Sequence, residues 1–390
     1  MIFKKHFSGL TKNTFLLTFT SLFADISTEM LYPILPIFLT QVLGAGGAVV
    51  GIVEGVAVAV QNIIQGASGA LSDKMRKRKP IALFGYLLAA LSKPFIGLST
   101  SWWGVFAARS VDRLGTGIRS APRDAMIANS ADEKSRGRAF GLEGIGDNLG
   151  AFLGPLLAVA LLSYFNVSIR NIFFFALIPG FLAVFMMLFV KEKADDLKAK
   201  SKLNVSLFKF PAQYWKYLAV IGVFGIGNIS SSFMILQTRN IGIPLTGTIL
   251  IYALFNLVAA FISYPAGALT DKMGRKGVLL FSFVLFFISL MGFASTKNFA
   301  VISLMFVLFG LYMGIFRAAG KAYASDFAPK EFRASAVGWY NTTVGFSGLI
   351  ASILAGQIYD RIGHATVFAT AAIFVFVGGA LLLTLRQKRA

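Results

Sequence analysis

Long apolar stretches separated by short polar segments run through almost the whole chain. Each stretch holds about 20 residues with few charges, and a helix of that length crosses the roughly 30 Å hydrocarbon layer of a membrane. The pattern predicts an all-α membrane protein with 12 transmembrane helices. They lie near 13–39, 47–71, 80–99, 102–124, 139–163, 170–190, 216–238, 247–270, 277–295, 299–321, 334–358 and 366–386.

The longest polar segment divides these helices into two sets of six. We expect an N-terminal six-helix bundle (1–190), a cytoplasmic linker (191–215) and a C-terminal six-helix bundle (216–390). A charged turn occupies the same place in each half, at Gly69–Lys79 and again at Gly267–Lys276, 198 residues later. Repeated halves with a site between them at the bilayer midplane are typical of secondary transporters.

The second charged turn reads Gly-Ala-Leu-Thr-Asp-Lys-Met-Gly-Arg-Lys. It resembles the G-x-L-x-D-x-x-G-R-K loop motif of the major facilitator superfamily, found between helices 2 and 3 and between helices 8 and 9. The first copy has Arg76 where the family has glycine. The resemblance covers essentially the whole chain and implies the MFS fold of two pseudo-symmetric six-helix bundles, working by alternating access. It also implies gating or structural roles for the motif residues Gly69, Asp73, Gly267, Asp271 and Arg275.

Composition supports the membrane class and excludes several others. Hydrophobic residues make up 56% of the chain and charged residues only 14%, too few to cover a soluble surface. The net charge of +20 would suggest nucleic acid in a soluble protein, but here we interpret it as topology. Of 37 lysines and arginines, only Arg170, Arg239, Lys297 and Arg361 fall in the loops on one side. The positive-inside rule therefore puts both termini in the cytoplasm of a multi-pass protein, which we place in a bacterial inner membrane.

Ionisable residues inside the predicted spans are the main functional candidates, because burying them in lipid is costly. Asp25 and Glu29 lie one turn apart on the first helix, and the prolines at 33 and 36 should bend its outer half. We expect Asp25 to take up and release a proton and Glu29 to tune it. The alternative is a structural ion pair with an arginine.

The fourth predicted helix carries Arg109, Asp112 and Arg113, with Asp112 placed to contact both arginines. Facilitators of the drug:proton antiporter type carry an arginine before a G-x-G on this helix, tied to proton coupling. This sequence departs from that pattern, because Arg109 precedes Gly115 by six residues and Arg113 by two, which leaves the equivalent arginine ambiguous. We choose Arg113, with Asp112 as its partner, and expect Arg109 to contact substrate. Arg119 and Arg123, nearer the cytoplasmic end, are expected to act in gating by pairing with Asp73.

The fifth predicted helix has glycines at 146, 150 and 154, followed by Pro155. This spacing gives one smooth face for close helix contact. A G-x-x-x-G-P pattern is similar to that of facilitator antiporters, so Gly150, Gly154 and Pro155 favour export. The alternative is ordinary small-residue packing. Asp147 and Glu143 share another face, from which they could partner Arg113 or Arg119, and we assign Asp147 to the proton-coupling group.

The second half has fewer charges within its spans. The substrate-binding candidates outside the fourth helix are Glu54, Asn228, Asn256, Arg317, Trp339, Tyr340 and Asn341. For Trp339 and Tyr340, lining a cavity and lying in the interfacial aromatic belt are equally supported readings.

Together these patterns predict a proton-coupled secondary transporter that exports a small amphiphilic organic compound, with sodium as the alternative coupling ion. A transporter of an anionic metabolite, siderophore or metal chelate is the main rival, since Lys93, Arg109, Arg113 and Arg317 could clamp an anion. A membrane sensor or scaffold is the non-transport rival. An enzyme is excluded because Ser68, in a G-x-S-G match, has no histidine base nearby.

We expect no cofactor, no resident metal and no nucleic-acid partner. Lacking cysteine, the chain has no thiolate ligands or disulfides.

Overall fold

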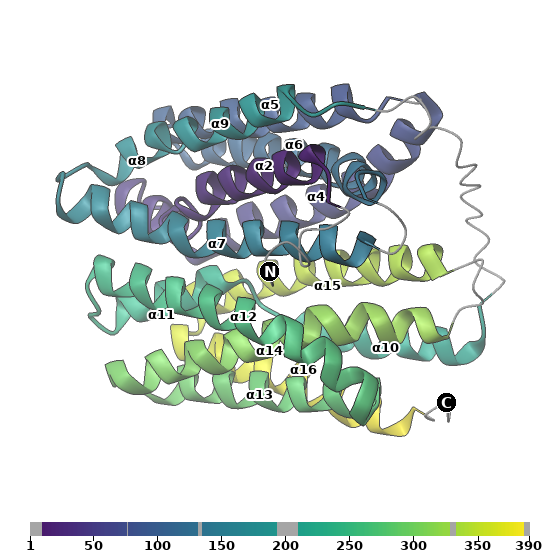
Figure 1. Ribbon diagram of the computed structural model, residues 1–390. Helices are drawn as coiled ribbons and strands as arrows, with labels where there is room; N and C mark the ends of the chain where they lie inside the picture. Colours follow the sequence, from purple (N-terminus) through teal and green to yellow (C-terminus); the bar gives the residue numbers. More distant parts are fainter. Residues whose placement is uncertain (1–9, 76, 132–134, 193–209, 328–332, 386–390) are drawn as a thin grey trace, which may run out of the picture. The chain divides into compact units, whose positions relative to one another are not determined.

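The computed structural model describes residues 10–75, 77–131, 135–192, 210–327 and 333–385 (Figure 1). These residues are helical apart from turns and an isolated β-bridge between Leu10 and Ala131. By their internal contacts they form two compact units. Unit 1 comprises Met1–Phe38 and Val60–Lys202, and unit 2 comprises Leu39–Ala59 and Leu203–Ala390. The predicted division differs in one segment, because Leu39–Ala59 has its contacts in unit 2.

Unit 1 is a bundle of helices that run alongside one another (Figure 1). Its elements are α2 (Lys12–Glu29), α3 (Leu35–Ile37), the second part of α4 (Gly47–Met75), α5 (Lys79–Leu98), α6 (Trp102–Asn129), α7 (Arg136–Ser163), α8 (Ile169–Phe175) and α9 (Leu177–Leu188). The predicted span 13–39 is interrupted after Glu29, in the region where the two prolines were expected to bend it. There α2 ends in a turn, followed by α3 and the π-helical segment η1 (Phe38–Val42).

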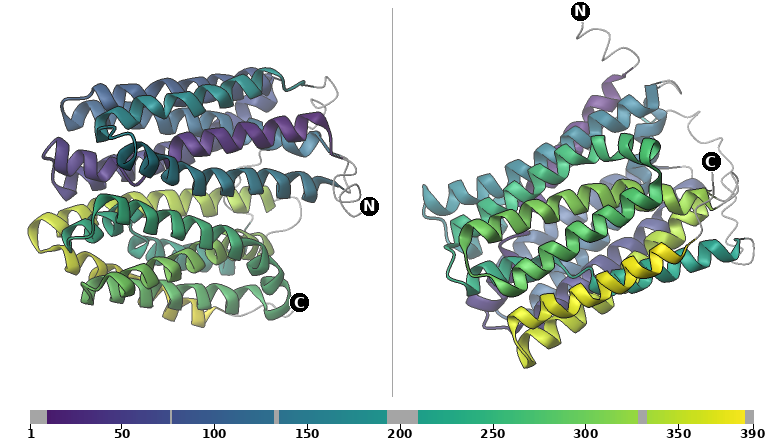
Figure 2. Two further views of the ribbon diagram at one scale, coloured as in Figure 1. Left: turned by 60° about the vertical axis from the view of Figure 1, so that its left-hand side comes forward. Right: turned by 90° about the horizontal axis from the view of Figure 1, so that it is seen from below.

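Unit 2 is also a helical bundle, visible from two further directions in Figure 2. It contains the first part of α4 and α10 (Ala212–Gly227), α11 (Ser231–Asn240), α12 (Leu245–Met273), α13 (Arg275–Ser295), α14 (Phe299–Asp326), α15 (Arg333–Arg361) and α16 (His364–Thr384). The predicted span 216–238 was wrong as a continuous helix, because it is interrupted between Gly227 and Ser231. The span 170–190 is likewise divided, into α8 and α9.

The two units repeat the same set of helix neighbours. In unit 1 the closely packed pairs are α2 with α7, α2 with α9, α5 with α6 and α5 with α9. In unit 2 the matching pairs are α10 with α15, α10 with α16, α13 with α14 and α13 with α16. The sequence repeat is therefore a repeat of packing within each unit.

Ten helical segments in the described residues are long and apolar enough to cross a membrane. The predicted spans 13–39 and 102–124 are helical but are not among them. Threonine and serine lower the hydropathy of α2, which also carries Asp25 and Glu29, and α6 carries six charged residues. These two polar helices hold four of the five proton-coupling candidates, Asp25, Glu29, Asp112 and Arg113.

Aromatic rings fill the interior of unit 2. Phe224 stacks on Phe283 with ring centres 3.7 Å apart, and Phe286 stacks on Tyr312 at 4.2 Å. All four side chains are fully buried or nearly so. Many of the chain's 39 phenylalanines thus serve packing within this unit.

Candidate functional site: buried ionic clusters of unit 1

Three glycines bring α7 into close contact with the backbone of α2. A Cβ atom added at Gly146, Gly150 or Gly154 would lie 2.8, 2.6 and 2.8 Å from the carbonyl oxygens of Thr18, Leu22 and Ile26, respectively. Real Cβ atoms essentially never approach below 3.0 Å, so only glycine fits at these positions. The predicted smooth face on α7 is present, and α2 is the helix that it contacts.

This contact places the acidic face of α2 against α7. A Cβ at Gly150 would lie 2.8 Å from the Cβ of Asp25, and one at Gly154 would lie 3.1 Å from the backbone carbon of Glu29. Both acidic side chains are half-buried. The charges that act on Asp25 electrostatically include those of Asp147, Arg119 and Arg123. Asp25 therefore belongs to a group of charges contributed by α2, α6 and α7.

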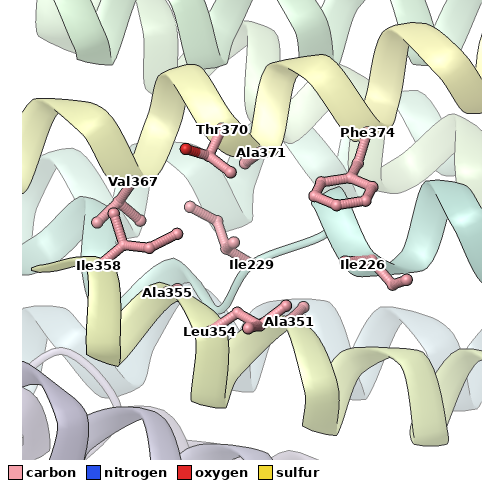
Figure 3. A pocket seen from close by; sticks show the side chains of 10 residues that line it. All are labelled: Ile226, Ile229, Ala351, Leu354, Ala355, Ile358, Val367, Thr370, Ala371 and Phe374. Carbon is pink, nitrogen blue, oxygen red and sulfur yellow. The ribbon is translucent and has the colours of Figure 1, made fainter.

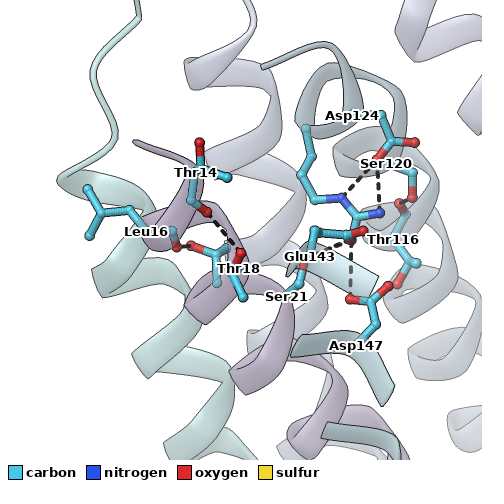
Figure 4. Close-up of polar contacts among 11 residues, drawn as sticks. Thr14, Leu16, Thr18, Ser21, Thr116, Ser120, Asp124, Glu143 and Asp147 are labelled. Atoms are coloured by element: carbon cyan, nitrogen blue, oxygen red, sulfur yellow. Dashed lines mark hydrogen bonds and ion pairs between the residues drawn. The ribbon is translucent and has the colours of Figure 1, made fainter. Parts of the chain in front are cut away.

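Arg123 of α6 contacts several carboxylates, and we call this group the Arg123 cluster. Figure 4 labels its partners Ser21, Asp124, Glu143 and Asp147. Arg123 Nη1 lies 3.0 Å from Glu143 Oε1 and 3.8 Å from Asp147 Oδ1, and Nη2 lies 2.9 Å from Asp124 Oδ1. Nη1 also donates to the Ser21 hydroxyl at 3.0 Å, which donates in turn to Glu143 at 3.1 Å. Glu143 and Asp147 share a face of α7, as expected, but the arginine that they contact is Arg123 rather than Arg113 or Arg119.

A second cluster lies within α6. Asp112 Oδ2 lies 3.0 Å from both Arg109 Nη1 and Arg113 Nε, forming an ion pair with each arginine. Arg113 Nη1 donates to Gln61 Oε1 at 3.2 Å. None of the three charged residues is more than 9% exposed. Both guanidinium groups contact the same carboxylate oxygen, so Asp112 offsets the repulsion between them. For two like charges about 4 Å apart, that repulsion is about 4 kcal/mol at an effective dielectric constant of about 20. Arg109 also lies over the Tyr32 ring, 5.6 Å from its centre.

Lys93 of α5 is buried beside this cluster. Its ammonium donates to the hydroxyls of Ser27 and, at 3.3 Å, Thr28 of α2, and it interacts electrostatically with Asp112. From the sequence we predicted Lys93 only as part of an anion clamp. Its hydroxyl partners were missed because no sequence pattern indicates that a serine and a threonine beside Asp25 and Glu29 bind a lysine.

Arg119 has an aromatic partner rather than a carboxylate among the contacts of the described residues. Its guanidinium lies over the Tyr86 ring of α5, 4.3 Å from the ring centre. The predicted pairing of Arg119 or Arg123 with Asp73 lies outside the described side chains. Gly69 packs near Ala121 of α6, at 3.2 Å from the position of an added Cβ.

The turn of the second motif copy, between α12 and α13, includes residues whose contacts are described. Gly274 has φ +83°, a conformation that favours glycine, and it separates α12 from α13. Arg275 donates to the Ala322 carbonyl at 2.6 Å and pairs with Asp326 at the end of α14. Arg275 thus fastens α13 to α14. The side chain of Asp271 and residue Gly267 lie outside the described side chains.

The interruption between α10 and α11 centres on Asn228. Ile229 N donates to Gly227 O at 2.9 Å, a tight turn that replaces helical hydrogen bonding, and the Ser230 hydroxyl caps α11. The Tyr312 hydroxyl donates to Asn228 Oδ1 at 3.0 Å. Asn228 is therefore held at a break in a predicted transmembrane helix, a place where transporters often bind substrate.

The remaining substrate candidates have varied surroundings. Tyr340 is only 2% exposed and stacks parallel to Tyr217, so it belongs to the core of unit 2 and not to an interfacial belt. Trp339 is half-buried beside Trp215, at 6.5 Å between ring centres. Glu54 is buried, Asn256 and Asn341 are half-buried, and Arg317 is exposed.

A small cavity adjoins the break in unit 2 (Figure 3). Side chains from α10, α15, α16 and the interrupted segment line it, among them Ile226, Leu354, Thr370 and Phe374. Its volume of about 20 Å³ accommodates a single water molecule, so it is not a substrate site.

Ser68, the serine of the G-x-S-G match, donates to the Gly117 carbonyl at 3.0 Å and so joins α4 to α6.

The fold and the buried charges define the class of the protein: a polytopic helical membrane protein with internally repeated units and ionised groups inside its bundle. The family model of the Major Facilitator Superfamily matches residues 17–238 and 217–390. The chain is 36% identical over 380 residues to an uncharacterised MFS-type transporter of Methanocaldococcus jannaschii, covering 96% of this chain and 95% of the relative. It is 25% identical over 367 residues to the multidrug resistance protein MdtH of Photorhabdus laumondii, covering 90% and 87%.

The fold also matches a solved structure. A crystal structure of a variant of the nucleoside transporter NupG superposes with a TM-score of 0.84 at 14% identity, over 96% of this chain and all of that one. The chain belongs to the Major Facilitator Superfamily. It is a secondary transporter with the MFS fold and not an enzyme.

Proposed function

We propose that this transporter couples proton movement to the export of a small amphiphilic organic compound across the cytoplasmic membrane, with both termini in the cytoplasm. The observation that carries the proposal is the Arg123 cluster, together with Asp25 on the adjoining face of α2. Several carboxylates share few cations there, so protonating one of them changes which ion pairs form. Such groups inside a membrane bundle are functional candidates by default.

On this proposal Asp25 and Asp147 exchange protons, and Glu29 tunes Asp25. Arg119 and Arg123 are the cations acting on Asp25, whereas Arg113 has Asp112 and Gln61 as its contacts. Conformational change would alter the solvation of these carboxylates and their distance from the arginines, allowing proton uptake on one side and release on the other. Export is favoured by the G-x-x-x-G-P pattern of α7 and by the likeness to MdtH, a multidrug resistance protein.

The anionic-substrate alternative rests on a separate observation. Arg113 is nine-tenths buried, and its Nη2 has no hydrogen-bond partner within the described part of the chain. A carboxylate or phosphate on the transported compound would satisfy that donor.

The test is flux into proteoliposomes with three labelled amphiphiles: an aromatic quaternary ammonium, an aromatic alcohol and an aromatic carboxylate. We expect a pH gradient to drive at least one of them uphill. Asp25→Asn should abolish uphill movement while leaving exchange at equal pH. Glu29→Gln, one turn along the same face, should have a smaller effect.

A sodium gradient that drives flux without any pH gradient would overturn proton coupling. Uphill transport by Asp25→Asn at the parent rate would remove Asp25 from the mechanism. Preference for the carboxylate, lost in Arg113→Gln, would favour the anionic alternative.

A further inference from the structure

Unit 2 has an amphipathic groove along α10 and α16 that the transport proposal does not use. Its volume is about 410 Å³, within the range of small-molecule binding sites. The groove is polar at one end, with Gln213, Lys216 and Thr384, and becomes apolar toward Val220 and Val223. We refer to it as the α10–α16 groove.

The polar end of the groove coincides with a membrane boundary. Gln213 lies in the first turn of the α10–α11 span, which begins at Ala212, and Thr384 is the last residue of the α16 span. Trp215, which is 38% exposed, lies on the same turn as Lys216 and is typical of the membrane–water interface. A ligand in this groove would therefore have its polar end at headgroup depth and its apolar end among lipid tails.

Positive charge gathers at that polar end. Lys216 is exposed and lines the groove. Lys276 of α13 donates to the carbonyls of Leu383 and Leu385 at 2.8 and 2.6 Å, which fixes a second cation beside the end of α16. The side-chain oxygen of Gln213 is buried and has no hydrogen-bond partner among the described residues. The end of the groove thus offers cations for a phosphate and an acceptor for a hydrogen-bond donor.

We propose that the α10–α16 groove binds one phospholipid whose headgroup combines a phosphate with a hydrogen-bond donor, such as phosphatidylglycerol. The phosphate lies at Lys216, with Lys276 adding positive potential. A headgroup hydroxyl donates to Gln213, and an acyl chain follows Ala219, Val223 and Leu381. A choline headgroup carries no hydrogen-bond donor, so phosphatidylcholine satisfies only part of the site. Anionic lipids are attracted to lysines near the membrane surface by about 1 kcal/mol for each lysine.

The experiment uses the full-length protein, delipidated in a neutral detergent, with bound lipid counted by native mass spectrometry. We expect one phosphatidylglycerol to remain bound at concentrations where phosphatidylcholine does not. Lys216→Ala should weaken that binding about fivefold, the factor corresponding to about 1 kcal/mol. Ala219→Trp, at an exposed position in the groove, should block the acyl chain and remove the bound lipid.

Lys297→Ala is the matched control, because it removes a lysine near the opposite ends of the helices and should leave lipid binding unchanged. Size-exclusion profiles show whether each variant remains folded. Equal retention of the two lipids, or equal loss in Lys216→Ala and Lys297→Ala, would overturn the proposal. Displacement of the lipid by glycerol phosphate at equal concentration would identify a site for soluble phosphate compounds and would also overturn it.

Discussion

The contact between α2 and α7 gives the most direct test of the structure, through the single change Gly150→Ala. The added methyl group would lie 2.6 Å from the Leu22 carbonyl oxygen and 2.8 Å from the Asp25 Cβ. The Leu22 oxygen is part of the α2 backbone and the Asp25 Cβ is bonded directly to it, so neither atom can rotate away. The two helices α2 and α7 must therefore move apart until the closest distance reaches at least 3.0 Å. Overpacking of this kind typically costs about 1–3 kcal/mol.

The helix propensity of alanine works in the opposite direction, because replacing glycine by alanine stabilises a helix by about 1 kcal/mol. Gly144→Ala isolates this contribution. Gly144 lies on the same helix, and nothing lies within 4 Å of a Cβ added there. The propensity gain cancels between the two variants, leaving a difference of about 1–3 kcal/mol that reports the α2–α7 contact alone.

The assay is the apparent melting temperature of both purified variants in the same detergent. At a few degrees per kcal/mol, Gly150→Ala should melt about 2–8 °C below Gly144→Ala. Its uphill transport should also fall more, since Asp25 lies at the contact. Equal melting temperatures would refute the close approach of the two helices.

Three further predictions concern other parts of the chain. Tyr312→Phe removes the hydroxyl that donates to Asn228 but keeps the ring, and should lower the free energy of unfolding by about 1 kcal/mol, measured by denaturant titration. Asp360 accepts from the first backbone N–H groups of α4 at 2.7 and 2.8 Å, so Asp360→Asn should speed amide exchange in that turn about fivefold, measured by mass spectrometry. In the cysteine-free chain, a cysteine introduced at Lys77 should be shielded from an impermeant thiol reagent in intact cells, while one at Ala45 should react.

Each of these has an outcome that contradicts it. Tyr312→Phe and Asn228→Ala should not add when combined, because each removes the same hydrogen bond. Additive effects would mean that the bond contributes nothing. Unchanged exchange in α4 would show that Asp360 does not cap the helix, and reversed labelling of the two cysteines would overturn the topology.

The sequence was sufficient to predict most helices, because a span of 20 apolar residues has few alternatives in a membrane protein. It was insufficient at Asn228, where the apolar pattern continues across the break. Gly225, Gly227 and Ser230 are present there, but small and hydroxyl residues are also common within intact transmembrane helices. In the structure Asn228 at the break accepts from Tyr312, a tertiary contact that the local sequence does not specify.

Ion pairs were predictable within one helix and not between helices. The contacts of Asp112 with its two arginines follow from helical spacing. The partner of Glu143 and Asp147 depends on how α6 and α7 align lengthwise, which the sequence does not specify. The structure aligns them so that Arg123, rather than Arg113, meets both carboxylates.

The comparison of the two units bears on why the charges are there. The helix pair α5–α6 of unit 1 has its counterpart in α13–α14 of unit 2, and the offset of 198 residues places Met291 and Gly310 at the positions of Lys93 and Asp112. Removing an ion pair from water costs several kcal/mol for each ion, and replacing it with well-packed hydrophobic residues is often neutral or stabilising. In the interior of unit 2 these two helices pack through aromatic rings such as those of Phe286 and Tyr312. On the proposed function the buried charges of unit 1 serve proton coupling, because ion pairs can change with protonation and aromatic rings cannot.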